Sequence, residues 1–343
     1  MATLAVTPMR LPLRTPLVTA WGELRERDLL QVRLAFGEGD EGRGEAAPLE
    51  PYDGISLGVV AAALDAYGAI LRDAGPRDEH GALLAACAAE RDLPAALAAI
   101  DLALWDRAGR RAGRPVAQLL ATGAAAAVPV NATIGATDRA GASAAAEAAA
   151  HAGFGCVKVK VGVGDDAGRI AAVRAAAGPG MAIRIDANGA WSTAHEALAN
   201  LRALAPAGLE YAEEPVHGAD ALAAVRAAGV CAVAMDETAE PGAGATDAVC
   251  LKVGRSGGIT GLLRDARLAR AAGSDVYVAS AFDGPLGIAA GVHAAAALAA
   301  GGPLPWCGLA TLTAFDAPPP ALVPAGGAIA VPAGPGLIGA PAP

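Results

Sequence analysis

The second part of the sequence, from Val128 onward, alternates short apolar segments with alanine-rich segments of helical length. Most successive apolar segments begin about 22 to 30 residues apart, the length of one strand, one loop and one helix, which is typical of repeated βα units. We expect eight strands, at residues 128–134, 156–161, 182–187, 209–215, 231–237, 248–253, 276–280 and 306–312. Only the step into 248–253 is short, so the helix before it should be brief. Eight such units favour a closed parallel barrel.

The part before Val128 has a different pattern and predicts a separate α+β unit. "DLLQVRLAFGEG" followed by "EGRGEAAP" indicates a β-hairpin with glycines at its turn. Residues 56–73 and 81–121 have the apolar spacing of amphipathic helices. A tail rich in Pro, Gly and Ala follows Ala317. We expect this tail to pack back on the first unit, although its composition also suits a loose end.

The charge and composition of the chain exclude several classes of function. The net charge is −9 and no basic run is present, which argues against nucleic acid or an anionic membrane as a partner. The N-terminus lacks the apolar core of a signal peptide, and charged residues interrupt the alanine-rich runs before they could span a bilayer. Five cysteines without C-x-x-C spacing indicate neither a disulfide framework nor a zinc cluster. We therefore expect a cytoplasmic protein that acts on a small molecule.

Charged residues occupy the ends of five predicted strands, where a buried parallel strand should be apolar. They are Lys158 and Lys160 in "CVKVKVG", Asp186 in "IRIDANGAW", Glu213 in "YAEEP", Asp236 in "AMDE" and Lys252 in "CLKVGRSGG". In a barrel, the carboxyl ends of all strands meet at one mouth, where barrel enzymes carry their active sites. Buried charges are costly unless they are paired or bind a metal, so these residues should lie together.

Three of these residues are carboxylates on consecutive strands and form a candidate metal site. Asp186, Glu213 and Asp236 offer the oxygen ligands that Mg²⁺ prefers, with open positions for substrate oxygens. The alternative is that each acid caps the helix that follows its strand. That alternative explains a single residue well, but it explains three successive strand ends poorly.

The lysines flank the predicted metal site from two sides of the barrel. A metal and neighbouring ammonium groups lower the pKa of a lysine, which allows it to act as a general base near neutral pH. We expect Lys160 to be the base, Lys158 to keep it deprotonated by like-charge repulsion, and Lys252 to approach the substrate from the opposite face. The alternative for "CVKVKVG" alone is a half-exposed strand with a solvated lysine face.

The motifs "KVKVG", "RIDANGAW", "EEP", "MDE" and "LKVGRSGG", in this order, resemble the enolase superfamily, muconate-lactonizing subgroup, and "GRGEAAPL" resembles its capping-domain hairpin. The resemblance implies an α/β fold: a modified (β/α)7β TIM-type barrel at 126–312, with an α+β capping domain built from 1–125 and the C-terminal segment 313–343. It also implies that Asp186, Glu213 and Asp236 bind Mg²⁺, with Mn²⁺ as a substitute, and that Lys160 and Lys252 form the catalytic pair. The second glutamate of "EEP", Glu214, stays outside the ligand set.

Within this superfamily, the loops favour one branch. The mandelate racemase branch has a histidine base at the seventh strand, whereas "VASAFDG" has none, and His293 on the next helix is expected to be structural. The eighth strand, "CGLATLTAFD", is similar to the GL-x-T signature of o-succinylbenzoate synthases and lacks the D-x-D motif of dipeptide epimerases. "RLPLRTPLVTAWGELRERDLL" resembles the N-terminal substrate loop of these synthases. The implied substrate-binding residues are Arg25, Arg27, Asn188, Ser280, Asp283, Gly308 and Leu309.

The resemblance therefore implies a lyase that dehydrates 2-succinyl-6-hydroxy-2,4-cyclohexadiene-1-carboxylate to o-succinylbenzoate in menaquinone synthesis. The same lysines also suit an N-acylamino acid racemase, a dipeptide epimerase or a muconate-type cycloisomerase. A catalytically silent binding barrel is a further alternative. The expected partner is a small carboxylate, and the sequence does not determine whether the chain forms a homo-oligomer. Gly44 and Glu45 suit turn and interdomain roles as well as substrate contact.

Overall fold

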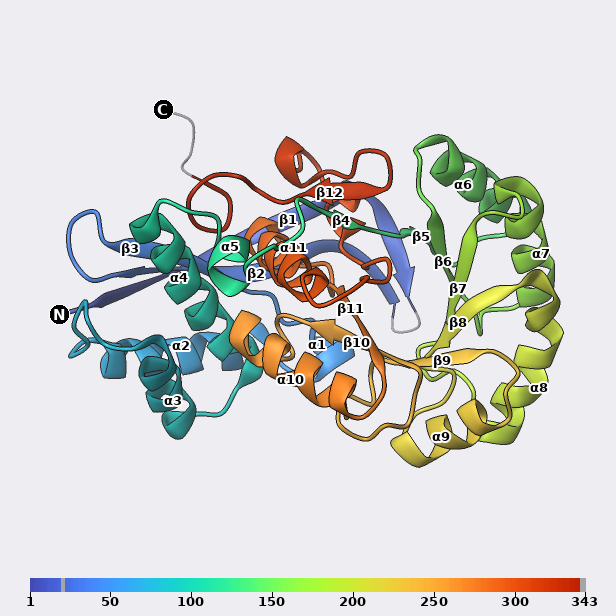
Figure 1. The fold of residues 1–343 in the computed structure, drawn as a ribbon, viewed down its shortest axis with the longest axis horizontal. Coiled ribbons are helices and arrows are strands. Elements are labelled where there is room, and N and C mark those ends of the chain that lie inside the picture. The colour runs from blue at the N-terminus through green and yellow to red at the C-terminus, as the bar shows by residue number, and fades with distance from the viewer. Residues whose placement is uncertain (20–21, 340–343) are drawn as a thin grey trace.

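The computed structural model describes residues 1–19 and 22–339 (Figure 1). Residues 20–21 of the expected substrate loop and residues 340–343 of the expected C-terminal segment lie outside the described residues. Among the described helices, none has both the length and the apolar composition that crossing a membrane requires. The architecture is α/β, with an N-terminal antiparallel sheet beside a curled parallel sheet, as predicted.

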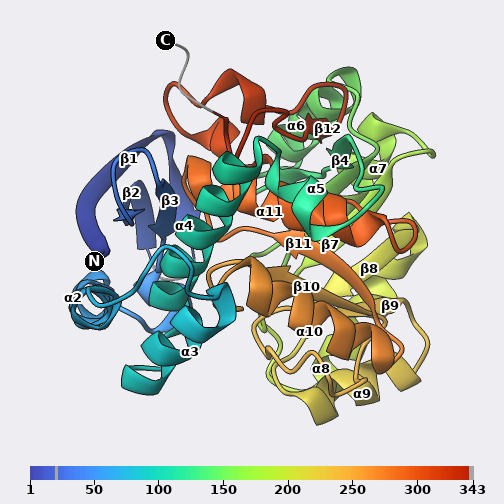
Figure 2. The ribbon, with the colours of Figure 1, turned by 60° about the vertical axis from the view of Figure 1, so that its left-hand side comes forward.

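The N-terminal part consists of a three-stranded antiparallel sheet and a group of helices. The sheet has the order β1-β2-β3, with β1 at Thr3–Thr19, β2 at Gly22–Ala35 and β3 at Glu41–Ala46. The helices are α1 at Glu50–Asp53, α2 at Leu57–Leu71, α3 at His80–Glu90, α4 at Pro94–Ala112 and α5 at Val116–Leu120. The predicted hairpin is confirmed as β2 and β3. Helices α2 to α4 lie beside this sheet in Figure 2, and a shared apolar core joins the two.

The close packing of β3 on α4 explains a glycine in the hairpin. A Cβ atom at Gly44 would overlap the backbone carbonyl oxygen of Ala99 in α4. The neighbouring Glu45 is buried, and its side chain contacts the second part of the molecule. Its carboxylate accepts hydrogen bonds from the backbone N–H groups of Gly284 at 2.7 Å and Leu286 at 3.3 Å. Glu45 therefore has the interdomain role named above, whereas Gly44 allows close packing within the N-terminal part.

The second part is built around a seven-stranded parallel sheet with the order β11-β10-β9-β8-β7-β6-β5. Its strands are β5 at Ala132–Ile134, β6 at Cys156–Lys160, β7 at Ala182–Asp186, β8 at Leu209–Glu213, β9 at Ala232–Met235, β10 at Ala248–Lys252 and β11 at Asp275–Ala279. The helices are α6 at Arg139–His151, α7 at Asp166–Ala177, α8 at Ala194–Leu204, α9 at Ala219–Ala227, α10 at Ile259–Ala271 and α11 at Pro285–Ala299. Helices α6 to α9 cover the outer side of the strands on the right of Figure 1.

Two predicted elements differ from the structure. The described residues between β9 and β10 form turns and no helix, so the brief helix expected there is wrong. The eighth strand, expected at 306–312, is reduced to two isolated bridges, in which Cys307 pairs with Val130 and Gly308 pairs with Ala279. These bridges lie between the first and last parallel strands, after which the chain turns into the 3-10 helix η2 at Ala310–Ala314. The length of so short a paired segment depends on the neighbouring strands on both sides. The sequence of residues 306–312 alone therefore does not reveal it.

The C-terminal segment contacts both parts of the molecule. After the 3-10 helix η3 at Pro320–Leu322, strand β12 at Ala328–Ala330 pairs antiparallel with β4 at Ala127–Pro129, directly before the parallel sheet. Farther on, the backbone N–H of Leu337 donates to the buried Asp106 of α4 at 2.8 Å. Its carbonyl accepts from Nε2 of the buried His293 at 2.8 Å, while Nδ1 of that ring accepts from the N–H of Ala117. This histidine therefore has a structural place between α5, α11 and the tail.

Candidate active site

The charged side chains at the strand ends lie at one level of the parallel sheet. Lys160 on β6 is the register partner of Asp186 on β7, which is in turn the partner of Glu213 on β8. Asp236 follows the end of β9. The three carboxylates are at most 3% exposed. The parallel register therefore brings the predicted acids together, because the carboxyl ends of neighbouring strands meet at one edge.

Lys158 and Lys160 project from the same face of β6 because alternate residues of a strand point to one side. The ammonium of Lys158 lies 2.9 Å from Asp186 Oδ2 and 2.9 Å from Glu213 Oε1, between the two carboxylates. Lys160 donates to Asp186 Oδ2 at 2.6 Å and to Asn188 Oδ1 at 2.5 Å. The two lysines therefore share one carboxylate oxygen, which places their charges close together.

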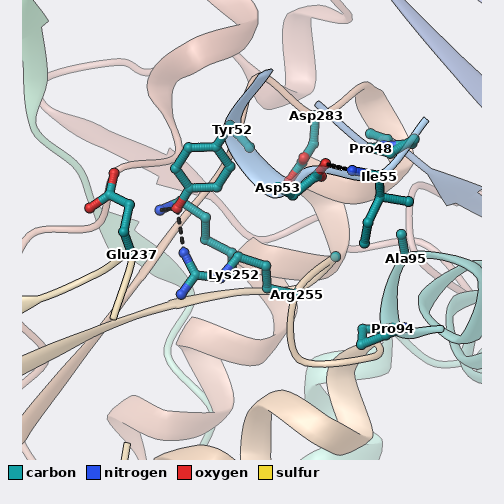
Figure 3. Close-up of a pocket in the computed structure, with 13 residues that line it drawn as sticks. Pro48, Tyr52, Asp53, Ile55, Pro94, Ala95, Glu237, Lys252, Arg255 and Asp283 are labelled. Carbon is teal, nitrogen blue, oxygen red and sulfur yellow. Dashed lines mark hydrogen bonds between the residues drawn. The ribbon is translucent and has the colours of Figure 1, made fainter. Parts of the chain in front are cut away.

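Lys252 contacts the same group of acids from β10, the strand next to β9 in the sheet. Its ammonium forms a hydrogen bond with the carboxylate of Asp236 and donates to the hydroxyl of Tyr52 at 2.9 Å. Arg255 donates to Asp236 Oδ1 at 3.1 Å and also to the Tyr52 hydroxyl. Tyr52 itself donates to Asp236 Oδ1 at 3.1 Å. Figure 3 shows Tyr52, Lys252 and Arg255 gathered at one side of a pocket.

The electrostatics of the site follow from the burial of many charges. Burial raises the pKa of the Asp186 carboxyl, but Lys158 and Lys160 outweigh it and hold this pKa well below its usual range. In the same way, Lys252 and Arg255 overcome the burial of Asp236 and lower its pKa to about 2. Burial of Glu213 is not fully compensated by Lys158, so the pKa of Glu213 is raised. The site thus holds at least two ionised carboxylates near neutral pH.

A cavity of about 240 Å³ opens on the Lys252 side of the acids, between the N-terminal part and the parallel sheet. Its lining comes from two segments of the N-terminal part and from the loops after β9, β10 and β11. The lining residues are Ala47, Pro48, Tyr52, Asp53, Ile55, Pro94, Ala95, Glu237, Lys252, Gly254, Arg255, Ala281 and Asp283. The apolar wall comes from the N-terminal part and most of the charges come from the parallel sheet, an arrangement suited to a small anionic ligand with an apolar body.

The residues expected to contact substrate have different surroundings. Asp283 lines the cavity, and burial raises its pKa to about 6. Ser280 Oγ and Thr311 Oγ1 are hydrogen-bonded at 2.7 Å. Arg27 is buried, but it donates to the backbone carbonyls of Pro48 and Ala47, each at 2.9 Å. It therefore links strand β2 to the segment before α1.

Three other residues expected to bind substrate form contacts away from the buried carboxylates. The side chain of Arg25 is 73% exposed and forms an ion pair with Glu23 at 2.5 Å on the surface of β2. The amide of Gly308, one of the implied substrate-binding residues, donates to the carbonyl of Val278 at 2.8 Å because this residue bridges to the end of β11. Leu309 is buried and follows this bridge.

Glu214, predicted to stay outside the ligand set, forms hydrogen bonds with the segment after β9 and with His217. Its carboxylate accepts from the N–H groups of Asp236 at 2.8 Å and Thr238 at 3.0 Å, and His217 lies 3.0 Å from Oε1. It therefore ties the end of β8 to the loop after β9.

Sequence reasoning missed Tyr52, Arg255 and Glu237. Glu237 Oε1 accepts from Asn188 at 2.7 Å, whereas its buried Oε2 has no hydrogen-bond partner among the described residues. Burial and the neighbouring Asp236 raise the pKa of Glu237 to about 8. Glu237 and Arg255 lie inside the quoted motifs "MDE" and "LKVGRSGG", so their positions carried a signal. Tyr52 is 184 residues from Asp236 and carried none.

The donor set of the site fits a divalent cation. Asp186, Glu213 and Asp236 are buried carboxylates at adjacent strand ends, and hard cations such as Mg²⁺ take oxygen ligands of this kind. Ligand atoms of Glu213, Asp236 and Cys250 all lie within 4.8 Å of one another, whereas Asp186 is engaged by Lys158 and Lys160.

All three lysines of the sequence are in this site. The chain has 26 Lys and Arg residues, and only Lys158, Lys160 and Lys252 are lysines. Elsewhere, buried or partly buried cations are arginines, such as Arg184 against Glu210 and Arg107 against Asp40. Lysine, unlike arginine, can lose its proton in a protein and act as a base. The composition of the cluster therefore points to proton transfer.

Comparisons with known proteins agree with this architecture. Residues 141–338 match the family described as "Enolase C-terminal domain-like", and residues 1–121 match "Mandelate racemase / muconate lactonizing enzyme, N-terminal domain". The chain is 41% identical to an o-succinylbenzoate synthase of Thermobifida fusca over 149 residues, which are 41% of this chain and 45% of that relative. It is 28% identical to an N-succinyl-L-Arg/Lys racemase of Bacillus cereus over 84% of this chain and 81% of that relative. The match to the synthase thus spans less than half of its length.

Solved structures extend the similarity to nearly the whole chain. A muconate lactonizing enzyme from Pseudomonas fluorescens, in complex with muconolactone, has a TM-score of 0.89 and 26% identity over 98% of this chain and 95% of that one. A dipeptide epimerase from Enterococcus faecalis, in complex with Mg and a dipeptide, has a TM-score of 0.88 and 25% identity over 98% of both chains. Because family models match both the N-terminal part and the part built around the parallel sheet, this chain belongs to the mandelate racemase and muconate lactonizing enzyme family of the enolase superfamily.

Proposed function

We propose that the protein is a Mg²⁺-dependent o-succinylbenzoate synthase, a lyase that dehydrates 2-succinyl-6-hydroxy-2,4-cyclohexadiene-1-carboxylate in menaquinone synthesis. The observation that carries the chemistry is the position of two amines, Lys160 on β6 and Lys252 on β10, against one group of buried carboxylates. The choice of dehydration is supported by the 41% identity to the synthase of Thermobifida fusca. The substrate would be a small carboxylate in the cavity beside Lys252.

In this proposal, Asp186, Glu213 and Asp236 would hold Mg²⁺, or Mn²⁺ as a substitute. When bound, the cation supplies positive charge against the negative charge that develops on the substrate carboxylate as the neighbouring proton leaves. Lys160 takes that proton, and the electron pair of the broken C–H bond forms a ring double bond as the C–O bond to the hydroxyl group breaks. Lys160 then returns the proton to the leaving hydroxide, so the products are o-succinylbenzoate and water.

Lys252 and its neighbours would serve the same step without transferring a proton. The ammonium of Lys252 is fixed by Asp236 and by the Tyr52 hydroxyl at 2.9 Å, so it presents a positive charge to the cavity that Lys252 lines. A cation beside the ring favours the build-up of negative charge in the transition state. Asn188, at 2.5 Å from Lys160 Nζ, orients the base.

The second candidate is a racemase or epimerase of N-acylated amino acids or dipeptides, with Lys252 as a second base. It is favoured by the 28% identity to the N-succinyl-L-Arg/Lys racemase, which extends over 84% of this chain. Dipeptide epimerases are among the similar structures, but residues 306–312 of this chain contain no D-x-D motif. This candidate keeps the same acids and lysines and changes only the role of Lys252.

The test is ultraviolet-monitored conversion of the succinyl cyclohexadiene substrate to o-succinylbenzoate, with Mg²⁺ and then with a chelator. Lys160→Ala should lower kcat by at least about 100-fold, the usual effect of removing a general base. Lys160→Arg is the matched control, because it keeps the positive charge but cannot act as a base. Turnover that survives in Lys160→Arg would contradict the role of Lys160. Absence of turnover, with exchange of the α-proton of N-succinyl amino acids for solvent deuterium, would move the function to the second candidate.

A further inference from the structure

A cysteine thiol lies among the buried carboxylates of the barrel, and the proposed dehydration makes no use of it. Cys250 is on β10, two residues before Lys252, so both side chains point from the same face of the strand into the barrel. Its sulfur and one oxygen each of Glu213 and Asp236 lie within 4.8 Å of one another. All three residues are at most 3% exposed. A thiol and two carboxylates thus converge on one point below the strand ends.

We propose that Cys250, Glu213 and Asp236 form a site for a thiophilic divalent cation such as Zn²⁺, Cd²⁺ or Co²⁺. Bonds of about 2.3 Å to sulfur and about 2.1 Å to oxygen place tetrahedral ligand atoms about 3.6 Å apart, within the range observed here. Mg²⁺ gains little from sulfur and keeps to oxygen ligands. Binding breaks the S–H bond of Cys250 and forms a metal–sulfur bond, and the proton leaves to solvent.

The site overlaps the position of a catalytic group. The ammonium of Lys252 lies 3.7 Å from the sulfur of Cys250 and forms a hydrogen bond with Asp236, so it is already among the same ligand atoms. A cation bound there must move Lys252 away from Asp236. The cation also takes Glu213 and Asp236, which, if the proposed function holds, are ligands of Mg²⁺. Thiophilic cations should therefore inhibit the enzyme in competition with Mg²⁺, and should not replace it as activators.

The other cysteines of the chain differ from Cys250. Among the described residues, no other cysteine belongs to a group of three residues whose ligand atoms converge in this way. Cys156, on β6, is equally buried and has one carboxylate neighbour, Glu210 Oε2 at 3.8 Å. It is therefore a matched control: a buried barrel cysteine beside a carboxylate, but without the second acid.

The experiment is a titration of the full chain with Co²⁺, followed by the cobalt–thiolate charge-transfer absorption in the near ultraviolet. The wild-type chain and Cys156→Ser should show this band at one equivalent of Co²⁺, whereas Cys250→Ser and Cys250→Ala should not. A band that is absent from the wild-type chain, or that persists in both Cys250 variants, overturns the proposal. The wild-type arm does not depend on the folding of any variant.

Inhibition gives a second and independent readout. Zn²⁺ should inhibit Mg²⁺-dependent turnover of the wild-type chain, and its inhibition constant should rise at least about tenfold in Cys250→Ser, as for the loss of a group that supports a bound metal. Equal inhibition constants would overturn the proposal. The spectrum requires no turnover, so a band without dehydratase activity refutes only the proposed function. Turnover without a band refutes only the thiophilic site.

Discussion

Two neighbouring tyrosines in the barrel differ in the partners of their hydroxyl groups, and this difference predicts opposite effects of the same substitution. Tyr277 on β11 is buried and donates to Oε2 of the buried Glu213 at 2.7 Å. Tyr211 on β8 is also buried, with its ring centroid 5.5 Å from that of Tyr277. Its hydroxyl oxygen has no hydrogen-bond partner among the described residues. Replacement by phenylalanine removes one oxygen from each site and keeps the ring.

The expected magnitudes follow from what each hydroxyl contacts. A hydrogen bond to a charged group contributes about 1.5–3 kcal/mol, and its loss leaves a buried carboxylate oxygen with one partner fewer. Tyr277→Phe should therefore lower the free energy of unfolding by about 2 kcal/mol, roughly a 30-fold change in the unfolding equilibrium. Tyr211→Phe removes a buried polar atom that gains nothing in the folded state. It should leave stability unchanged or raise it by up to about 1 kcal/mol.

The assay is urea unfolding of the wild-type chain and both variants at one pH. A change in midpoint at constant slope measures the change in stability, because the slope reports the surface exposed on unfolding. Equal destabilisation by the two substitutions would refute the reasoning, since it would mean that the hydroxyl of Tyr211 has a partner as strong as that of Tyr277. A neutral Tyr277→Phe would refute the hydrogen bond to Glu213.

Three further predictions concern the N-terminal part. Burial and the neighbouring Asp283 raise the pKa of Glu45 from 4.5 to about 8, so the folded chain keeps a proton that the unfolded chain releases, and stability falls as pH rises through this window. Between about pH 5 and about pH 8, the free energy of unfolding measured in urea should fall less in Glu45→Gln than in the wild-type chain. An equal fall in the two proteins would contradict a buried, protonated Glu45. Tyr52→Phe removes the hydroxyl that accepts from Lys252, so kcat/KM should drop about tenfold for a hydrogen bond of about 1.4 kcal/mol, and an unchanged value would exclude Tyr52 from the site. Gly44→Ala should destabilise by about 3 kcal/mol because its Cβ would overlap a backbone oxygen of α4, and thermal unfolding near the wild-type temperature would contradict that packing.

The parallel sheet and its acids could be predicted because their signals are local. A charge at the end of an apolar strand is visible in a few residues, and parallel register then brings Asp186 and Glu213 together without further information. The predictions that were wrong concern features that depend on residues distant in sequence. Residues 306–312 were expected to form a full strand, but Cys307 and Gly308 pair only through single bridges to Val130 and Ala279, and the geometry of both partners sets that length.

The contribution of the N-terminal part to the site could not be predicted for the same reason. Tyr52 lies in a four-residue helix, and its contacts are with residues about 200 positions away in sequence. Glu45 lies in a hairpin strand, where an acid is ordinarily exposed. Its carboxylate nevertheless accepts hydrogen bonds from the N–H groups of Gly284 and Leu286 at the start of α11. Such contacts depend on how the N-terminal part and the parallel sheet are placed against each other, and no periodicity in either part encodes that placement.

The use of lysine and arginine bears on whether this barrel is a catalyst or a silent binding protein. A barrel that needed only cations to neutralise buried acids could use arginine, as this chain does where Arg184 pairs with Glu210 beside two tyrosine rings. Arginine stays protonated in proteins and offers more hydrogen bonds, so it would serve a purely structural role at least as well. Instead, the chain places its three lysines against one group of carboxylates. Since proton transfer is what distinguishes the two side chains chemically, this distribution favours acid–base chemistry over silent binding, and conversion of Lys158, Lys160 and Lys252 to arginine should abolish turnover with the fold retained.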